Sequence, residues 1–402
     1  MWKEFATLRS HLHTLAKNNI LRKAAGFLDQ ARHGIIFAMK IMVTGASGLV
    51  GRSLMKMLTD SREHEVRGLA FSRARPPLER LDLTDEVEVA RYFEREAPEV
   101  VVHLAAERRP DIVDKDLRRA RAINVEATRI LARQCAARGA FLLLVSTDYV
   151  FDGTNPPYFP DSPVNPLNEY GKMKLESELA AEAALGASVG VAASLGAAAE
   201  PGGAASPGAA AARARPVGAG RGEPSSASAR PIDRAIMDAA HREPLGAARP
   251  SGAVLRISIL YGPVESLKES AVTEVAIALK TATPRLTDDW ANRYPLHVDD
   301  VSSALLAIVN AYGRDPASIA KFGAFPRFLL SGFPSYTKYD MVNIMAKSLG
   351  IDASHIQPDP NPPKGAPRPR DCRMDTSRLE SLGWKQQKML PAEIGPILKP
   401  FF

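Results

Sequence analysis

Three residues near the middle of the chain carry side chains that could reduce a ketone or oxidise an alcohol. Thr147 follows the apolar run Phe141–Val145, and Tyr170 and Lys174 come later as a Tyr-x-x-x-Lys pattern. Positions four apart share one face of a helix, so Tyr170 and Lys174 should point into the same space. We expect the Lys174 ammonium to lower the pKa of the Tyr170 phenol, and Thr147 to orient a carbonyl oxygen while Tyr170 transfers a proton. The alternative is an exposed helix that carries this common spacing without chemistry.

A glycine-rich turn near the start of the chain supplies a context for these residues. Lys40–Thr44 is typical of a short buried strand, and Arg52–Thr59 has the apolar spacing of a helix. Between them, Gly45 permits a tight turn, Gly48 lets the backbone approach a pyrophosphate, and Gly51 lets the helix pack on the strand. The phosphates would lie at a helix N-terminus, which favours anions. We expect these turn residues to bind a dinucleotide cofactor: Gly45, Ser47, Gly48, Leu49 and Gly51.

The type of cofactor follows from the end of the next predicted strand, Glu65–Phe71. An NAD site usually has a carboxylate there, whereas an arginine accommodates the 2′-phosphate of NADP. Here the sequence continues Ser72-Arg73-Ala74-Arg75, without a carboxylate. Arg73 and Arg75 can pair with a phosphate, which favours NADP(H) as the cofactor. The alternative is that both are solvated loop arginines.

Further cofactor contacts are expected at three other places. Asp82 and Leu83 follow a predicted strand end and should lie near the adenine. Ala105 and Ala106 follow the predicted strand Val100–Leu104, where small side chains admit the cofactor. Asn124, within the predicted helix 118–135, is either a buried polar support for the reacting groups or a residue that packs the helix.

The pattern of elements predicts the fold class. Strands and helices alternate through the first part of the chain, which indicates an α/β fold with a Rossmann-type, doubly wound parallel sheet. After the predicted strand Ala253–Leu260, helices are expected at Ser270–Leu279, Val301–Tyr312 and Tyr339–Leu349, with a loop at Pro358–Pro369. These should form a smaller C-terminal α/β substrate-binding lobe over the strand ends.

Four segments are therefore expected. Residues 1–38 form an N-terminal extension, 39–184 an NADP-binding Rossmann domain, 185–250 an insertion, and 251–402 the last Rossmann strands with the C-terminal lobe.

The extension is basic, with six Lys/Arg against two acids, and has Leu8, Leu12 and Leu15 at helical spacing. We expect a surface helix or a true start at Met39, and an organelle transit segment, which would direct the chain to mitochondria, is the alternative.

The insertion is dominated by Ala, Gly, Pro and Ser over 185–230. Such a segment cannot bury enough apolar surface to offset its ordering entropy, so disorder is expected, with a short helix at Pro231–His241. It would lie at a loop, where a long connection costs little.

Charge and composition exclude several classes of function. The net charge is +7, but the extension and the insertion, which has seven Lys/Arg against five acids, account for six of these charges. The remainder is nearly neutral, so nucleic-acid binding is not expected. No apolar run is long enough to cross a bilayer. Two cysteines suit a reducing, cytoplasmic compartment. The nearest approach to a metal site, His297 with Asp299 and Asp300, reads as the start of a helix, and no metal is expected.

Taken together, these residues resemble a known family. The glycine turn with Thr147, Tyr170 and Lys174 is similar to extended short-chain dehydrogenases/reductases, in the branch of dTDP-4-dehydrorhamnose reductase. Longer strings resemble, more specifically, the regulatory β subunit of methionine adenosyltransferase: AAERRPD at 105–111, DYVFDGTNPPY at 148–158, LRI at 255–257, ILYG at 259–262, ESAVT at 269–273 and RPR at 368–370. The resemblance covers residues 39 to about 182 and 252 to about 398.

That resemblance implies a regulatory protein that binds NADP(H) and a methionine adenosyltransferase catalytic subunit, and so tunes S-adenosylmethionine synthesis without catalysing it. Such a subunit is expected to dock through a C-terminal tail, and here that tail is short, ending at Pro400–Phe402. The reductase branch implies an alternative: an NADPH-dependent reductase of a nucleotide-4-keto-sugar, with Tyr170 as the acid. Arg108 and Arg109 depart from that branch's pattern, and they would bind an anionic ligand or a partner carboxylate, or lie in a solvated loop.

Overall fold

The structure of the protein, a computed structural model, describes residues 38–197, 249–362, 365 and 367–402. Two compact units are distinguished, one comprising Met1–Ser188 with Arg249–Phe402 and the other Val189–Ala248. Apart from the end of the helix that reaches Ala197, the described helices and strands belong to the first unit. The predictions for the extension and for the helix Pro231–His241 lie outside the described residues.

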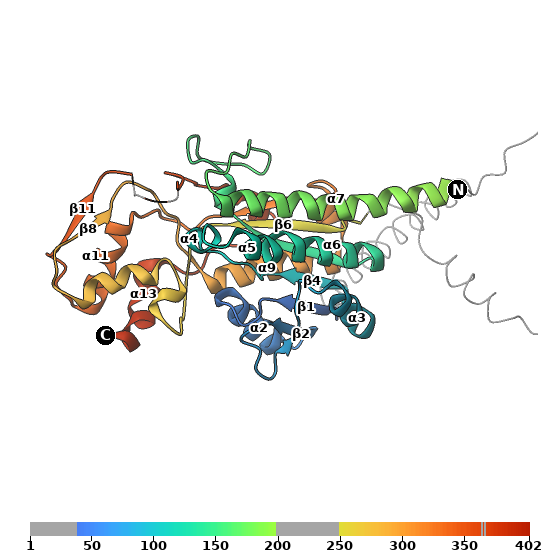
Figure 1. Ribbon diagram of the computed structural model, residues 1–402, viewed down its shortest axis with the longest axis horizontal. Helices are drawn as coiled ribbons and strands as arrows, with labels where there is room; N and C mark the ends of the chain where they lie inside the picture. The colour runs from blue at the N-terminus through green and yellow to red at the C-terminus, as the bar shows by residue number, and fades with distance from the viewer. Residues whose placement is uncertain (1–37, 198–248, 363–364, 366) are drawn as a thin grey trace, which may run out of the picture. The chain divides into compact units, whose positions relative to one another are not determined.

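A parallel sheet of seven strands forms the centre of the fold, in the order β10-β6-β5-β4-β1-β2-β3 (Figure 1). Its strands are β1 (Lys40–Thr44), β2 (Glu65–Ala70), β3 (Glu79–Arg80), β4 (Val100–His103), β5 (Phe141–Thr147), β6 (Gly252–Ile257) and β10 (Arg327–Leu330). The predicted α/β class and Rossmann-type sheet are confirmed. Because both faces are covered, the central strands are buried, as in β4, whose four residues are all buried, whereas β2 and β3 carry exposed charged residues.

Helices pack on both faces of this sheet. Alternate strand residues point to opposite sides, so Ile41 and Val43 join one core cluster with α2 (Leu49–Ser61) and α9 (Val298–Arg314). Met42 joins the other cluster. The helices of that face are α3 (Glu86–Glu96), α6 (Ala127–Arg138) and α7 (Glu169–Ala197). Helix α7 continues through Ala197, past residue 185, at which the sequence predicts that the insertion begins.

The order of the strands reverses between β1 and β4. From β1 the chain builds outward to β2 and β3, then returns to β4 and builds the other way through β5 and β6. In open α/β sheets, ligands bind outside the carboxyl ends of the strands at such a switch point. The glycine turn after β1 lies there, next to the residues that follow β4.

The predicted helix over 118–135 is interrupted. It consists of α5 (Leu117–Arg121), a π-helical turn η1 (Ala122–Glu126) and then α6. A short helix, α4 (Pro110–Val113), precedes it, and a 3-10 turn, η2 (Asp148–Val150), follows β5. A single π turn inside an α-helix often marks a functional position, and this one contains Asn124.

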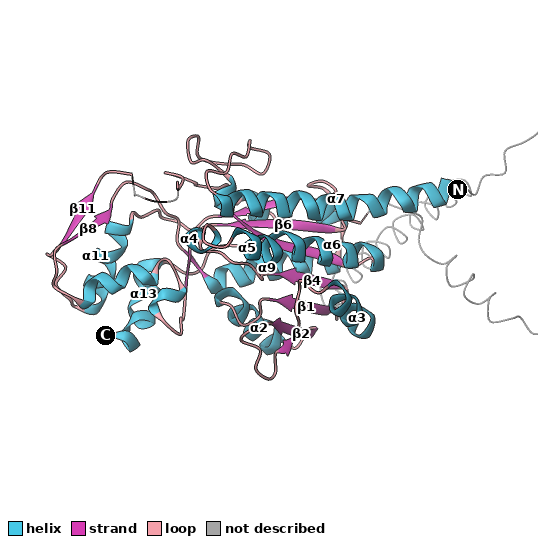
Figure 2. Cartoon of the chain, in the orientation of Figure 1, coloured by secondary structure: helices cyan, strands magenta, loops and turns pink. Residues whose placement is uncertain are grey.

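The C-terminal lobe has its own core, made mainly from helices α11 (Lys338–Leu349) and α13 (Leu390–Leu398). Figure 2 shows these helices with the short parallel pair β8 (Arg285–Asp288) and β11 (Ile356–Asp359). The remaining elements are β7 (Leu260–Tyr261), β9 (Leu296–His297), η3 (Leu267–Glu269), η4 (Thr273–Lys280), α10 (Ala317–Ala320), α12 (Ser377–Glu380) and η5 (Lys399–Phe401).

Two expectations for this half differ from the structure. The predicted strand 253–260 ends at Ile257, and Leu260–Tyr261 pairs instead with β9 in a separate sheet. The predicted helix 270–279 begins at Thr273 and is of the 3-10 type, because the Ser270 hydroxyl accepts from the Val272 amide and holds the chain before it. His297 does precede a helix, as predicted: it caps α9 by accepting from the Asp299 amide at 3.1 Å.

A buried ion pair joins α7 to β6. Arg256 donates to both carboxylate oxygens of Glu178, at 3.0 and 2.6 Å, and the two side chains are 2% and 0% exposed. Loss of one partner would leave the other charged and buried, which is strongly destabilising.

We therefore expect Glu178→Gln to lower the free energy of unfolding by about 3 kcal/mol. Glu182→Gln is the matched control, because Glu182 lies on the same helix as Glu178 and pairs with Arg327, but its side chain is 42% exposed. Loss of this exposed pair should cost less than about 1 kcal/mol. Urea denaturation at pH 7 measures both, and equal losses would contradict the assignment.

Candidate functional site

The turn after β1 is built so that only glycine fits at two positions. Gly45 has φ +68°, and a Cβ there would lie 2.7 Å from the Ala105 nitrogen. A Cβ on Gly51 would lie 2.3 Å from the Gly45 oxygen. The Gly48 amide donates to the Gly45 carbonyl at 2.9 Å, and α2 starts at Leu49 with Gly48 as its N-cap and no side-chain cap. The first amides of α2 thus have no side-chain acceptor at this end, which fits a bound pyrophosphate.

Arginines surround this turn. Arg73 follows β2, is 51% exposed, and lies 3.6 Å from each of Glu265 and Glu269. Arg52 in the first turns of α2 donates to the Ser47 carbonyl at 3.2 Å and to both oxygens of Glu269. Cationic side chains beside a glycine turn fit a dinucleotide that carries an additional phosphate. Arg75 is exposed in the same loop, where its carbonyl accepts from the Leu78 amide.

The residues expected near the adenine divide into one polar and one apolar. Asp82 accepts from the amide and the hydroxyl of Thr84, at 2.9 and 2.7 Å, while its own amide donates to Glu88. Leu83 is buried in the core under β2 and α3. The Asp82 side chain therefore stabilises the turn at residues 82–84, and Leu83 anchors this turn in the core.

Asn124 holds the loop that follows β4. Its side-chain oxygen accepts from the Glu107 amide at 2.8 Å, and its side-chain nitrogen donates to the Glu107 carbonyl at 3.0 Å. Asn124 is 1% exposed. The clamp fixes the course of the chain just after Ala105 and Ala106, which are both half-buried beside the glycine turn. Asn124 thus positions the loop with its side chain.

Thr147 and Tyr170 come together as predicted from their spacing. Thr147 ends β5 and Tyr170 lies in the first turn of α7. Burial raises the pKa of the Tyr170 phenol, and the nearby Thr147 hydroxyl opposes that rise only in part. The charged groups that act most strongly on this phenol are Asp148 and Arg108. Tyr170 is therefore neutral at physiological pH, in the form that can donate a proton.

Lys174 does not act on Tyr170 as predicted. Its ammonium is 2.7 Å from the Val145 carbonyl, to which it donates. Burial lowers the pKa of Lys174 to about 8, against the opposing charge of Glu178. The expectation that Lys174 lowers the pKa of Tyr170 is corrected, because the phenol pKa is raised by burial and the ammonium is directed at the β5 backbone.

A further acid and several cations adjoin Tyr170. Asp148 accepts from the Thr147 hydroxyl at 3.1 Å, and burial raises the pKa of Asp148 to about 6. The rings of Tyr149 and Tyr170 meet edge to face, with centroids 5.8 Å apart. Arg293 and Arg368 from the C-terminal half both oppose the burial that raises the pKa of Tyr149. Tyr170 thus has Arg108 and Asp148 as its charged neighbours, and two further arginines act on the adjoining Tyr149.

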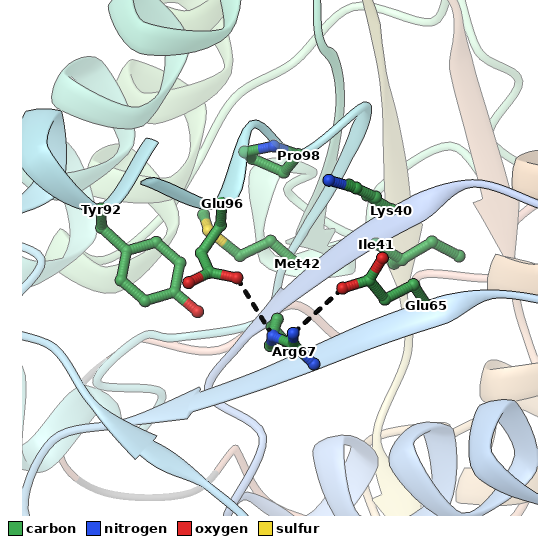
Figure 3. Close-up of a pocket in the computed structure, with 8 residues that line it drawn as sticks. All are labelled: Lys40, Ile41, Met42, Glu65, Arg67, Tyr92, Glu96 and Pro98. Atoms are coloured by element: carbon green, nitrogen blue, oxygen red, sulfur yellow. Dashed lines mark hydrogen bonds and ion pairs between the residues drawn. The ribbon is translucent and has the colours of Figure 1, made fainter. Parts of the chain in front are cut away.

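A hollow elsewhere on the sheet has a different character. Figure 3 shows it at the amino ends of β1 and β2, where Arg67 lies between Glu65 and Glu96 and forms ion pairs of 3.0 and 3.1 Å. Because its charges neutralise one another and it lies at the strand ends opposite the glycine turn, we do not assign the cofactor to it.

Sequence reasoning missed three residues at the site. Arg52 had a signal, since a cation in the first turns of a helix opposes the dipole. Asp148 had a weaker one, since it directly follows Thr147. Glu269 had none, because it lies 217 residues from Arg52 and reaches it only through the fold. Among the described residues, no cluster of metal-ligating side chains comes together, and no helix in that part of the chain has the length and apolar character to span a membrane.

Comparison with known proteins identifies full-length relatives. Residues 39–191 match the family described as RmlD substrate binding domain. The chain is 35% identical to methionine adenosyltransferase 2 subunit beta of Bos taurus, over 90% of this chain and 88% of that protein.

Solved structures with a similar fold include dTDP-4-dehydrorhamnose reductases and a dTDP-glucose 4,6-dehydratase. A dTDP-4-dehydrorhamnose reductase of Clostridium acetobutylicum matches with a TM-score of 0.63 at 20% identity, covering 90% of this chain and 99% of that chain. The reductase of Bacillus anthracis, solved in complex with NADP, matches with a TM-score of 0.62 at 17% identity, covering 90% and 98%. These structures establish that the chain has the fold of the two dTDP-4-dehydrorhamnose reductases.

The raised pKa of Asp148 makes a prediction about stability. Because folding raises the pKa of Asp148, protonation of this residue stabilises the folded state. This contribution to the free energy of unfolding is fully present below the ordinary pKa of 3.8 and is lost as the pH rises through about 6. Asp148→Asn should therefore flatten the pH dependence of unfolding between about pH 4 and 6, and stabilise the protein at pH 7 by on the order of 1 to 3 kcal/mol. Urea midpoints at a series of pH values measure this.

Asp152→Asn is the matched control, because hydrogen bonds lower the pKa of Asp152, and its loss should destabilise the protein at pH 7. If Asp148→Asn were destabilising at pH 7, the protonation assigned to Asp148 would be wrong.

Proposed function

The chain belongs to the family of methionine adenosyltransferase 2 subunit beta proteins, and from that premise we propose that it is a non-catalytic, NADP-binding regulatory subunit of methionine adenosyltransferase. It binds the catalytic subunit in the cytoplasm and modulates S-adenosylmethionine synthesis without carrying it out. The extent of the match carries the proposal, since it spans 88% of the bovine relative at 35% identity. The similarity to solved reductases is at 20% identity and supports the fold alone.

NADP is the cofactor that the glycine turn and its arginines support. Gly45 and Gly51 keep the backbone close around the start of α2, where a pyrophosphate would accept from free amides. Arg73 follows β2 where an NAD site usually has a carboxylate, and it would pair with the 2′-phosphate. Ala105 and Ala106 leave room beside the turn.

One feature of the reductase-type set favours binding over turnover. A reductase step uses hydride from bound NADPH, and the chain's own task is to deliver a proton to the substrate oxygen. Tyr170 is neutral and can donate that proton, and Thr147 can orient the oxygen. The Lys174 ammonium, however, donates to the Val145 carbonyl, so it does not stabilise the phenolate that the donation would leave.

A second candidate is an NADPH-dependent reductase of a nucleotide-4-keto-sugar. The observation that favours it is the proximity of the Thr147 hydroxyl to the Tyr170 phenol, together with the cations Arg293 and Arg368 near Tyr149. Positive charge there suits the diphosphate of a nucleotide sugar.

The partner is tested by affinity purification of the tagged chain from its native cell in the presence of NADPH. We expect the methionine adenosyltransferase catalytic subunit to be enriched, and Tyr170→Phe to recover it equally, because that change removes only a buried hydroxyl. Absence of the catalytic subunit from the eluate would refute the proposal. Oxidation of NADPH with dTDP-4-dehydrorhamnose, abolished in Tyr170→Phe, would establish the reductase instead.

The cofactor has its own test in Arg73→Ala. Loss of a charge-assisted bond to phosphate costs about 1.5–3 kcal/mol, so the dissociation constant for NADPH should rise about 10- to 100-fold. The constant for NADH should change less than about twofold. Fluorescence titration measures both. Lys56→Ala is the control, because Lys56 is an exposed cation of α2 that pairs with Asp60. An equal loss for NADPH and NADH would exclude Arg73 as the phosphate ligand.

A further inference from the structure

Three arginines from separate parts of the nucleotide-binding half meet one glutamate from the C-terminal half. Glu269 accepts from Arg52 at 2.7 and 2.9 Å, one bond to each carboxylate oxygen. Arg73 approaches the same carboxylate at 3.6 Å. Arg108 donates to the Glu269 main-chain carbonyl. The Glu269 side chain is 10% exposed, so its carboxylate is largely shielded from solvent, whereas Arg73 is half exposed.

The Glu269 carboxylate is held as a phosphate would be held. A guanidinium binds carboxylate and phosphate through the same two-pronged geometry, and Arg52 uses that geometry here. The Glu265 amide adds a third donor at 2.9 Å. Burial opposes ionisation of Glu269 most strongly, yet the bonds from Arg52 and the Glu265 amide and the charges of Arg52 and Arg73 together lower its pKa. The donors around this carboxylate therefore favour an anion at this position, and Glu269 supplies it.

The Glu269 carboxylate lies beside Arg73, the arginine that we expect to select the cofactor. Arg73 lies three residues after the end of β2, and Arg52 also donates to the Ser47 carbonyl of the glycine turn at 3.2 Å. Since one carboxylate reaches both Arg52 and Arg73, one phosphate placed there can reach both as well. The contacts of Arg73 are long and it is half exposed, so it can exchange partners at little cost.

The carboxylate is part of a short stretch of the C-terminal half, Pro263–Ser270, here called the 263–270 segment. Arg52 also donates to the Pro263 carbonyl at 3.3 Å. At its other end, the Ser270 hydroxyl donates to the Leu260 carbonyl and accepts from the Val272 amide. The segment is thus anchored at Ser270 by its own half, and Arg52, Arg73 and Arg108 connect it to the nucleotide half, where Val264 also packs against the core of the sheet.

We propose that Glu269 is a displaceable internal anion at the 2′-phosphate subsite, which competes with the cofactor phosphate for Arg52 and Arg73. NADP(H) therefore loosens the 263–270 segment, whereas NAD(H), which lacks the phosphate, leaves it bound. Glu269 thus affects the preference for NADP(H) or NAD(H), although it lies far from the glycine turn in the sequence. Binding of a phosphate at this subsite changes how firmly the 263–270 segment of the C-terminal half is held. This inference rests on the proposed cofactor and does not depend on the proposed partner.

The first test is a binding titration of the full chain and of Glu269→Gln, which keeps the shape and removes the charge. NADPH and adenosine 2′,5′-bisphosphate should bind about five- to tenfold more tightly to Glu269→Gln than to the unaltered chain. NADH and 5′-AMP should differ less than twofold. Glu274→Gln is the matched control, because Glu274 is an exposed acid of the neighbouring η4, and it should change none of the four constants. Unchanged or weaker binding of the two 2′-phosphorylated ligands in Glu269→Gln would overturn the proposal.

The second test is hydrogen exchange in peptides that cover the 263–270 segment. The Glu265 amide is protected by its bond to the Glu269 carboxylate, so NADPH should speed exchange there several-fold and NADH should not. In Glu269→Gln, exchange should be fast without any cofactor. Slower exchange with NADPH would show that the phosphate closes the segment, and would contradict displacement.

The outcomes separate this inference from the proposed function. If the unaltered chain binds neither NADPH nor adenosine 2′,5′-bisphosphate, the proposed cofactor and the displacement fail together. If it binds both but Glu269→Gln behaves like the unaltered chain, displacement fails and the proposed cofactor stands.

Discussion

The near-contact of two backbone segments at the switch point is the constraint on which the rest of the site depends. The turn after β1 and the residues after β4 approach so closely that Gly45 has no room for a side chain, and a Cβ on Gly51 would overlap the same turn. A buried chain of hydrogen bonds holds this junction, from Thr44 through His103 to Thr128. Burial lowers the pKa of His103 to about 3, so the chain of hydrogen bonds stays neutral over the physiological range.

From that junction the two sides of the site extend. On one side, α2 begins at the turn and brings Arg52 to the same place as Arg73 from the end of β2. On the other, the π turn at Asn124 clamps the Glu107 backbone and so directs Arg108 toward the C-terminal half. The arginines then need an anion, because three guanidinium groups close together repel one another. Glu269 meets that need, and it joins the halves of the fold by charge as well as by packing.

Local patterns predicted much of this arrangement. The strand at 40–44, the glycine turn, and the approach of Thr147 to Tyr170 are readable because each depends on spacing within one short stretch. The features that the sequence does not predict depend on contacts between residues far apart in the chain. The Lys174 ammonium was expected at Tyr170, but the β5 carbonyl of Val145 lies within its reach, and a sequence does not show which acceptor is nearer. The strand predicted at 253–260 is split because Leu260 pairs with Leu296 of β9, which only the folded chain brings beside it.

A site that could serve a reductase thus occurs in a chain of the methionine adenosyltransferase 2 subunit beta family, for which we propose a regulatory role. The most direct measurement is the rate of S-adenosylmethionine formation by a purified methionine adenosyltransferase catalytic subunit, with and without this purified chain and NADPH. A regulatory role predicts that a stoichiometric amount of the chain changes kcat or the KM for methionine, and that the effect saturates as the complex fills. Kinetics that stay unchanged with the chain in large excess would contradict it.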